Sequence, residues 1–182
     1  GDAAVQPSAQ STSSLSGKVL RFNLDGSIPS DNPFANSAIW SYGHRNQQGL
    51  VVANGIMYAS EHGPDVEDEL NIVEKGRNYG WPVIGYGVNY TTGLAIHKGT
   101  HQEGMEQPKH IWVPSIGISG AMFYTGDKFP QWKGNLFVAG MAGQQVEEGD
   151  ERRAGGEGQR EVAGGVPHLR RRERHVVPRV AA

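Results

Sequence analysis

Short runs of hydrophobic residues follow one another along the first 145 residues of the chain. Residues 38–43, 49–53 and 56–61 are short, largely apolar runs, and residues 17–24 (GKVLRFNL) alternate with a period of two. This is the period of a β-strand, and Asn54-Gly55 between residues 49–53 and 56–61 predicts a type I′ hairpin turn. Further strands are predicted at residues 69–74, 117–126 and 134–140. No segment has the periodicity of a long amphipathic helix.

The connections between these runs are rich in Gly, Pro, Asn and Asp, and residues 91–108 are most simply a long loop. Many short strands joined by such turns predict an all-β protein. The strand groups recur about every 40–50 residues, which favours the blades of a β-propeller over a β-sandwich, the alternative fold. About three blades fit into residues 17–145, whereas a closed propeller needs at least four. The sequence therefore predicts part of a propeller.

The composition changes sharply after residue 145. Residues 146–182 contain most of the arginines but no lysine and no aromatic residue, and they have no usable apolar period. A disordered tail and the product of an out-of-frame reading are both compatible with this composition, whereas acidic residues interleaved among the arginines disfavour a basic nucleic-acid arm. We therefore divide the chain into an entering loop (residues 1–16), a partial propeller (17–145) and this tail (146–182).

Charge and cysteine content exclude several classes of function. The formal net charge is −2, so no strong attraction to nucleic acid is expected. No apolar run approaches the roughly 20 residues of a membrane span, and the first residues lack the features of an intact signal peptide. Without cysteine the chain has no disulfide, thiolate metal site or cysteine nucleophile.

The polar residues concentrate in three clusters, of which the first is residues 41–50 (SYGHRNQQGL). It lies between two predicted strands, where functional groups often gather on a rigid scaffold. Arg45 offers a planar, permanently charged group suited to a carboxylate or a developing oxyanion, and Asn46 offers both a donor and an acceptor. By themselves, however, both side chains could simply satisfy backbone groups in a tight turn.

The second cluster, residues 60–71 (SEHGPDVEDELN), contains five acidic side chains. Such loops can hold Ca²⁺ through carboxylates and backbone carbonyls, although the spacing excludes an EF-hand and a solvated acidic turn is an equal alternative. His62 has no partners at the spacing of a transition-metal site. In the third cluster, residues 76–82 (GRNYGWP), Tyr79 and Trp81 are predicted to be half-buried packing residues.

Taken together, the motifs GKVLRFNLDGSIPSDNPF, GHRNQQGL, SEHGPDVEDELN and GRNYGWP, in this order and spacing, resemble the soluble quinoprotein sugar dehydrogenases. The likeness covers roughly residues 15–145 and extends through SGAMFYTGDKFPQWKGNLFVAG, which is most similar to the aldose sugar dehydrogenase branch. It implies a six-bladed β-propeller that binds pyrroloquinoline quinone (PQQ) and Ca²⁺ in a central cleft. Such enzymes oxidise the anomeric carbon of an aldose to a lactone and pass electrons to an external acceptor. The resemblance also implies a periplasmic or secreted protein.

The same resemblance assigns roles to individual residues. Arg45 is expected to polarise the quinone. The other expected cofactor-binding residues are Asn46, His62, Asp68 and Ser115. Of these, Asp68 is expected to support the loop that contains Gly63 and Pro64. Gly63 and Pro64 would offer backbone carbonyls to the catalytic Ca²⁺. Glu69, by its carboxylate, and Tyr79, by its backbone carbonyl, are expected to bind a second, structural Ca²⁺.

Departures from the family pattern predict that this chain alone is inactive. The general-base His of the family lies in an earlier blade, so we expect it outside these 182 residues, and His44 is not that base. Ala142 stands where some relatives have a cofactor-binding Lys, and the tail replaces an expected Arg-x-Arg-Asp segment. A non-catalytic, calcium-binding propeller is the alternative function.

Overall fold

The computed structural model describes residues 1–142, 145–150 and 169–170, and these residues form strands and loops with two short 3-10 helices. In chain order the elements are η1 (Gln6–Gln10), β1 (Lys18–Leu20), β2 (Ile39–Tyr42), β3 (Gln47–Ala53), β4 (Ile56–His62), β5 (Asp68–Ile72), β6 (His110–Trp112), β7 (Ile118–Phe123), η2 (Pro130–Trp132), β8 (Asn135–Gly140), β9 (Gln145–Asp150) and β10 (Leu169–Arg170).

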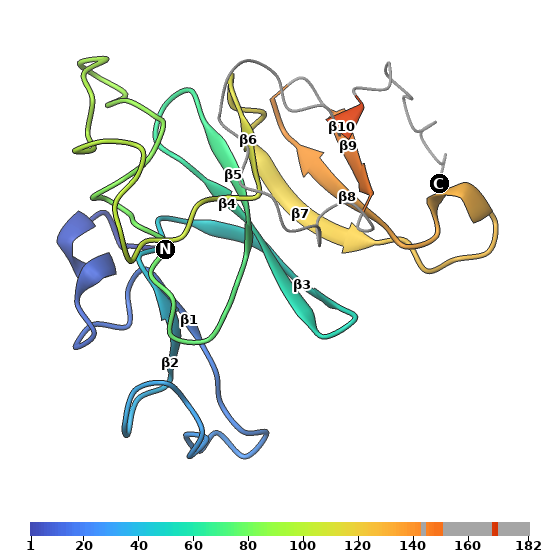
Figure 1. Ribbon diagram of the computed structural model, residues 1–182. Coiled ribbons are helices and arrows are strands. Elements are labelled where there is room, and N and C mark those ends of the chain that lie inside the picture. The colour runs from blue at the N-terminus through green and yellow to red at the C-terminus, as the bar shows by residue number, and fades with distance from the viewer. Residues whose placement is uncertain (143–144, 151–168, 171–182) are drawn as a thin grey trace, which may run out of the picture.

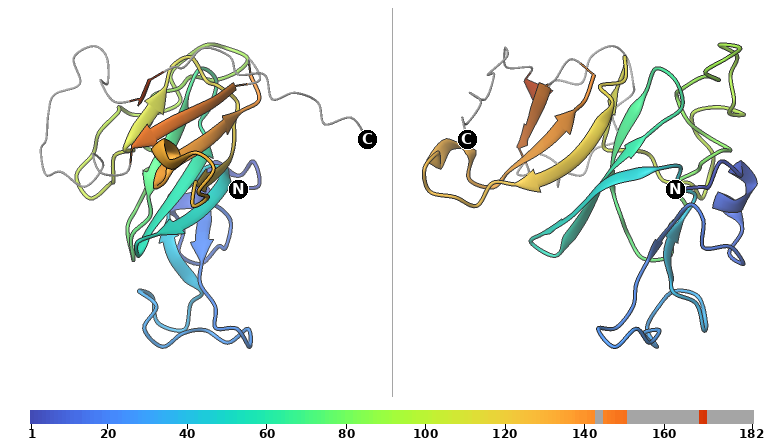
Figure 2. Two further views of the ribbon diagram at one scale, coloured as in Figure 1. Left: turned by 90° about the vertical axis from the view of Figure 1, so that its right-hand side faces the viewer. Right: turned by 180° about the vertical axis from the view of Figure 1, so that it is seen from behind.

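The strands form two four-stranded antiparallel meanders and one two-stranded ribbon. Strands β3, β4, β5 and β6 make the first sheet in chain order, and β7, β8, β9 and β10 make the second. Strands β1 and β2 pair separately. The two sheets lie side by side, with the ribbon next to the first of them (Figures 1 and 2). Sequential antiparallel strands of this kind are the pattern of propeller blades.

The β3–β4 hairpin follows directly from its turn residues. Asn54 and Gly55 have φ angles of 50° and 79°, which are the two positive values that a type I′ turn requires. Ala53 accordingly pairs with Ile56, and the register continues along both strands. The predicted hairpin is confirmed.

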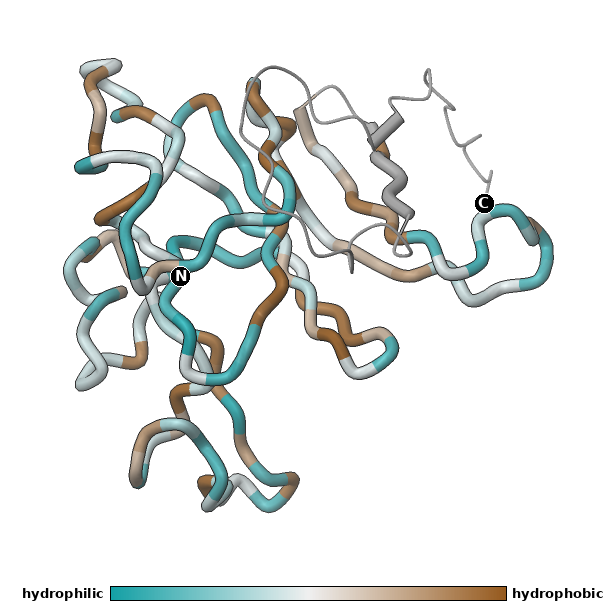
Figure 3. Tube along the Cα trace, in the orientation of Figure 1, coloured by the Kyte–Doolittle hydropathy of each residue, from teal (hydrophilic) through white to brown (hydrophobic). Residues whose placement is uncertain are grey.

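Strand β4 is buried on both faces of the first sheet, because its side chains alternate between two cores. On strand β4, Tyr58 packs toward the second sheet, in a core with Ile118 and Val138. The neighbouring Ala59 packs toward the ribbon, in a smaller cluster with Val19. Hydrophobic residues accordingly lie on the β3–β4 hairpin and along β7 and β8, while the loops are largely hydrophilic (Figure 3).

Two strands and one boundary differ from the sequence prediction. Strand β6 follows the predicted loop but has only three residues, too few to give a periodic signal. Strand β9 pairs with β8 from Gln145 onward, so the boundary predicted between residues 145 and 146 falls within a strand. The rest of the predicted tail lies outside the described residues, apart from 169–170. No helix in the described part of the chain is long and apolar enough to cross a bilayer.

Candidate functional site

Hairpin β3–β4 brings the first two polar clusters together. The strands are antiparallel, so the residues before β3 lie beside those after β4. Gln47 pairs with Glu61, and the backbone N–H of His62 donates to the carbonyl of Asn46 over 3.0 Å. The loop that carries Arg45 therefore adjoins the Gly63–Pro64 turn.

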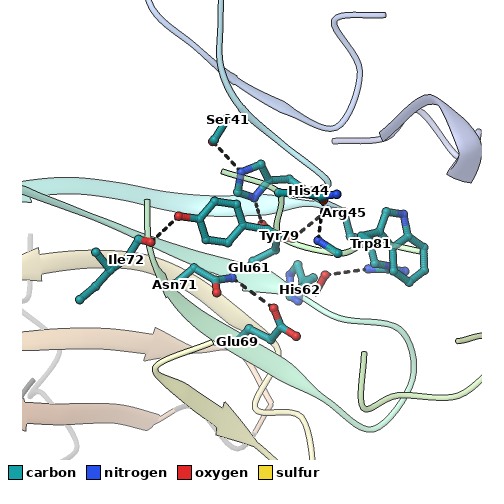
Figure 4. A network of polar contacts seen from close by, with 12 residues as sticks. Ser41, His44, Arg45, Glu61, His62, Glu69, Asn71, Ile72, Tyr79 and Trp81 are labelled. Atoms are coloured by element: carbon teal, nitrogen blue, oxygen red, sulfur yellow. Dashed lines mark hydrogen bonds and ion pairs between the residues drawn. The ribbon is translucent and has the colours of Figure 1, made fainter. Parts of the chain in front are cut away.

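Arg45 is fixed at both its backbone and its guanidinium (Figure 4). Its backbone N–H donates to Oε1 of Glu61 over 2.7 Å. Its guanidinium donates to the backbone carbonyl of His62 over 3.1 Å and to the hydroxyl of Tyr90 over 3.3 Å. The guanidinium carbon also lies 5.3 Å from the ring centre of Trp81 and 5.7 Å from that of Tyr90, within the range of cation–π attraction. These contacts hold a permanent positive charge in one place.

A buried network supports Arg45 from behind. The ring of His44 is fully buried; its Nε2 lies 2.8 Å from the hydroxyl of Ser41, and its Nδ1 lies 3.0 Å from Oε2 of Glu61. The same ring stacks on Tyr79 at 4.5 Å with an angle of 18° between the planes (Figure 4). His44 thus orients the carboxylate that binds the Arg45 backbone, and it is itself inaccessible to any substrate.

Asp68 connects the first sheet to the second. Its Oδ1 lies 3.1 Å from Nδ1 of His62, and its Oδ2 accepts hydrogen bonds from the Ser115 hydroxyl over 2.7 Å and the Ile118 backbone N–H over 3.0 Å. Only 1% of Asp68 is exposed. This carboxylate holds the His62 ring and the segment that enters β7 in a common arrangement.

A small cavity lies under Arg45. The Gly63–Pro64 turn, three glutamates and two aromatic residues of the third polar cluster contribute to its lining. The lining residues are Arg45, Glu61, His62, Gly63, Pro64, Glu67, Glu69, Tyr79, Trp81 and Ile84. Asn46 faces instead an open hollow that it shares with Arg45 and residues 1–4.

Two acidic residues of this cavity, Glu67 and Glu69, have raised pKa values. Burial raises the pKa of Glu67 to about 7, and the charges of Asp68 and Glu61 add to that shift, against hydrogen bonds from the backbone of Tyr86 and Gly87. Burial also raises the pKa of Glu69 well above its usual range, with further contributions from Glu67 and Glu61. Carboxylates that resist ionisation together form a place where a bound cation would be favourable.

The described residues contain no group of three or more His, Asp or Glu side chains arranged to hold a metal ion. A cation here would therefore need backbone oxygens among its ligands. The carbonyls of Gly63 and Pro64 each accept one long hydrogen bond, from the Tyr90 hydroxyl (3.4 Å) and the Glu67 backbone N–H (3.3 Å). Because a carbonyl oxygen has two lone pairs, each retains capacity for another partner.

Comparison with known proteins identifies the family. A family model described as Glucose / Sorbosone dehydrogenase matches residues 1–176. The chain belongs to the glucose/sorbosone dehydrogenase family. Aldose sugar dehydrogenase YliI of Escherichia coli is 43% identical over 155 residues, covering 80% of this chain and 42% of that protein. Quinoprotein glucose dehydrogenase B of Acinetobacter calcoaceticus is 59% identical over 127 residues, covering 67% of this chain and 26% of the relative.

Solved structures of the same family share the fold. The apo form of the soluble aldose sugar dehydrogenase from Escherichia coli superimposes with a TM-score of 0.78 at 40% identity, covering 82% of this chain and 46% of that one. The PQQ-bound aldose sugar dehydrogenase from Streptomyces coelicolor gives 0.68 at 31% identity, covering 85% and 41%. The chain spans less than half the length of the curated relatives it matches. Part of a β-propeller is thereby confirmed, and a sandwich is excluded.

Within this family member, the predicted site residues divide into two groups. Those that line the cavity are Arg45, His62, Gly63, Pro64, Glu69 and Tyr79. Asn46, Asp68 and Ser115 are not among its lining residues: Asn46 borders the open hollow, and Asp68 and Ser115 form the hydrogen-bonded support of His62. The geometry thus brings most of the predicted residues together, while their roles remain predictions.

Sequence reasoning missed several residues that the structure places at this site. Tyr90 is 45 positions after Arg45, and no local pattern links the two. Trp81 was predicted only to pack, yet it also faces the Arg45 guanidinium. Glu61 belongs to the acidic cluster of residues 60–71 but had no predicted role; its available signal was that it closely follows the apolar start of β4, where a buried charge needs a partner.

Proposed function

We propose that this chain forms part of a PQQ- and calcium-dependent dehydrogenase that oxidises the anomeric carbon of aldose sugars to lactones. Hydride would pass to the quinone, and an external acceptor would then take the electrons. The proposal also includes a periplasmic or secreted location. It rests on the family membership and on one feature of the site, the Arg45 guanidinium held next to the Gly63–Pro64 turn.

The residues present fit a quinone with several carbonyl and carboxylate oxygens. Arg45 is a permanent cation whose position is set by Glu61, His62 and two aromatic rings, so little reorganisation is needed when negative charge develops nearby. Asn46, next to Arg45 at the open hollow, adds an amide that can both donate and accept.

Calcium also fits the chemistry of the donors. Ca²⁺ prefers oxygen ligands, both carboxylate and backbone carbonyl. The Gly63–Pro64 turn supplies carbonyls next to Arg45, and Glu69 supplies a carboxylate beside Tyr79 in the same cavity. The raised pKa of Glu69 follows from burial and from the neighbouring negative charges, which a bound cation would offset.

The chain's own residues would bind and orient rather than move the substrate proton. When bound, PQQ supplies the hydride acceptor and Ca²⁺ supplies Lewis acidity. Arg45 would hold the quinone oxygen and stabilise its developing charge, while Asp68 keeps His62 in place. His44 is fully buried and cannot act as the general base. We therefore propose that the chain alone does not turn over.

A titration with PQQ in the presence of Ca²⁺, followed by absorbance, tests the binding part. We expect saturable binding that weakens ~30- to 150-fold in Arg45→Ala, because a charge-assisted contact contributes roughly 2–3 kcal/mol. Arg77→Ala is the matched control, because Arg77 is an exposed arginine paired with Glu74 and Glu106. Absence of quinone binding by the unaltered protein would refute the proposal.

Dye-linked oxidation of glucose by the same reconstituted sample tests the catalytic part. We expect quinone binding without turnover. Robust turnover would refute the claim that a base from another part of the protein is required, while leaving the family chemistry in place.

A further inference from the structure

Glu67 is a buried carboxylate with an oxygen that has no partner. Only 2% of the residue is exposed, and its Oε2 has no hydrogen-bond donor within the described part of the chain. The side chain lines the same cavity as Glu69 and Tyr79. A buried, unpaired carboxylate oxygen is costly, so a structure that retains one requires a physical explanation.

Two neighbouring carboxylates, those of Glu61 and Asp68, are satisfied by protein groups on both oxygens. Glu61 contacts His44 and the backbone of Arg45. Asp68 has three partners, and Glu69 accepts a hydrogen bond from the side-chain amide of Asn71 over 3.1 Å. Among the described residues, no Lys, Arg or His forms an ion pair with Glu67 or Glu69. Glu67 and Glu69 are therefore the two carboxylates of this cavity whose negative charge no protein cation among the described residues neutralises.

The backbone around Glu67 is shaped to hold its side chain in place. A Cβ atom at Gly63 would lie 2.5 Å from Cγ of Glu67, and one at Gly87 would lie 2.9 Å from it, so the carboxylate occupies space that only two glycines leave free. The preceding Val66 has a φ of 76°, a conformation that is strained for a β-branched residue. Strain of this kind persists where the surroundings enforce it, often at ligand sites.

We propose that Glu67 is a direct ligand, together with Glu69, of a calcium ion bound beside Tyr79. The family resemblance assigns Glu69 and Tyr79 as ligands of this ion. Glu67 would add a second negatively charged ligand to the site. This inference takes only the identity of the cation, calcium, from the proposed function, and it does not depend on quinone binding. The remaining ligands would be backbone oxygens and water, because Ca²⁺ takes six to eight oxygens and the described residues offer no third converging acid.

Calcium titration by calorimetry, on protein without PQQ, tests this assignment. We expect one site of measurable affinity, weakened ~10- to 100-fold in Glu67→Gln because the number of charged ligands sets calcium affinity. Glu69→Gln should weaken the same site, and Glu103→Gln, an exposed loop residue, is the matched control and should change nothing. Terbium luminescence excited through aromatic residues gives a second measurement, because Tyr79 and Trp81 line the cavity.

The outcomes separate this inference from the proposed function. If Glu69→Gln abolishes calcium binding while Glu67→Gln leaves it unchanged, the role of Glu67 is overturned and the calcium site stands. If the unaltered protein binds neither calcium nor terbium, the inference is overturned, whereas the PQQ titration reports on the quinone site independently. Glu67→Asp keeps the charge, so partial retention of binding in that variant, with a normal thermal melt, supports ligation rather than a general folding defect.

Discussion

Replacing Asp68 with alanine tests how strongly one buried carboxylate couples the two sheets. Asp68 is 1% exposed and lies within hydrogen-bonding distance of His62, Ser115 and the backbone N–H of Ile118. Hydrogen bonds to a charged group contribute ~1.5–3 kcal/mol each, but burying the carboxylate costs several kcal/mol, so the expected net loss is ~3–5 kcal/mol. Removing it also leaves the Ile118 N–H, which is buried, without its acceptor.

Urea unfolding followed by tryptophan fluorescence measures this loss. Ser115→Ala removes only one of the three contacts and should cost ~1 kcal/mol. The double variant should lose less than the sum of the two single losses, because the Ser115–Asp68 contact is counted in both; the hydrogen bond from the Gly117 backbone N–H to Ser115 is lost only with the serine. A loss below ~1 kcal/mol for Asp68→Ala, or full additivity in the double variant, would show that the two sheets are coupled mainly by their apolar core.

Three further predictions concern strain, pH and the N-terminal segment. Val66→Gly should stabilise the fold by ~0.5–1 kcal/mol, since a left-handed conformation costs a branched residue more than glycine loses in entropy; an unchanged or lower melting temperature would contradict this. Burial lowers the pKa of His110 to about 4 from 6.5. Protonation therefore favours the unfolded chain, and up to ~3 kcal/mol of stability should disappear as the pH falls from 6.5 to 4, but not in His110→Gln. Lys18 donates from Nζ to three backbone carbonyls, so Lys18→Met should cost ~2–3 kcal/mol and should accelerate hydrogen exchange in residues 1–16; equal exchange would show that this segment is held by other contacts.

Local sequence predicted most of the strands because their signals are short-range. Asn54-Gly55 specifies the β3–β4 turn through its own backbone preferences, whatever the rest of the chain does. The limits of β1 were less predictable: the alternation continues to Leu24, yet the strand ends at Leu20 and Leu24 is fully exposed. Whether an alternating segment is a strand depends on a pairing partner, and the pattern alone does not contain that information.

The candidate site shows the same division. The resemblance carried by the motifs assigned Arg45 to the quinone and Glu69 and Tyr79 to a second calcium ion, and the order of the motifs indicated the family that the comparisons then established. Only the tertiary structure placed Tyr90 against Arg45 and Ser115 against Asp68, pairs separated by 45 and 47 positions. Contacts of that range depend on how the strands are arranged in space.

By itself, the sequence determined the all-β architecture, the hairpin turn and the residue types available for binding, because each depends on properties of neighbouring residues. The tertiary structure alone decided which acids are satisfied and which are not. Glu61 and Glu67 read alike in the sequence, yet one is paired with His44 and Arg45 and the other keeps an oxygen without a donor. The physical reason is that burial and partners are set by distant segments that meet only in the folded chain.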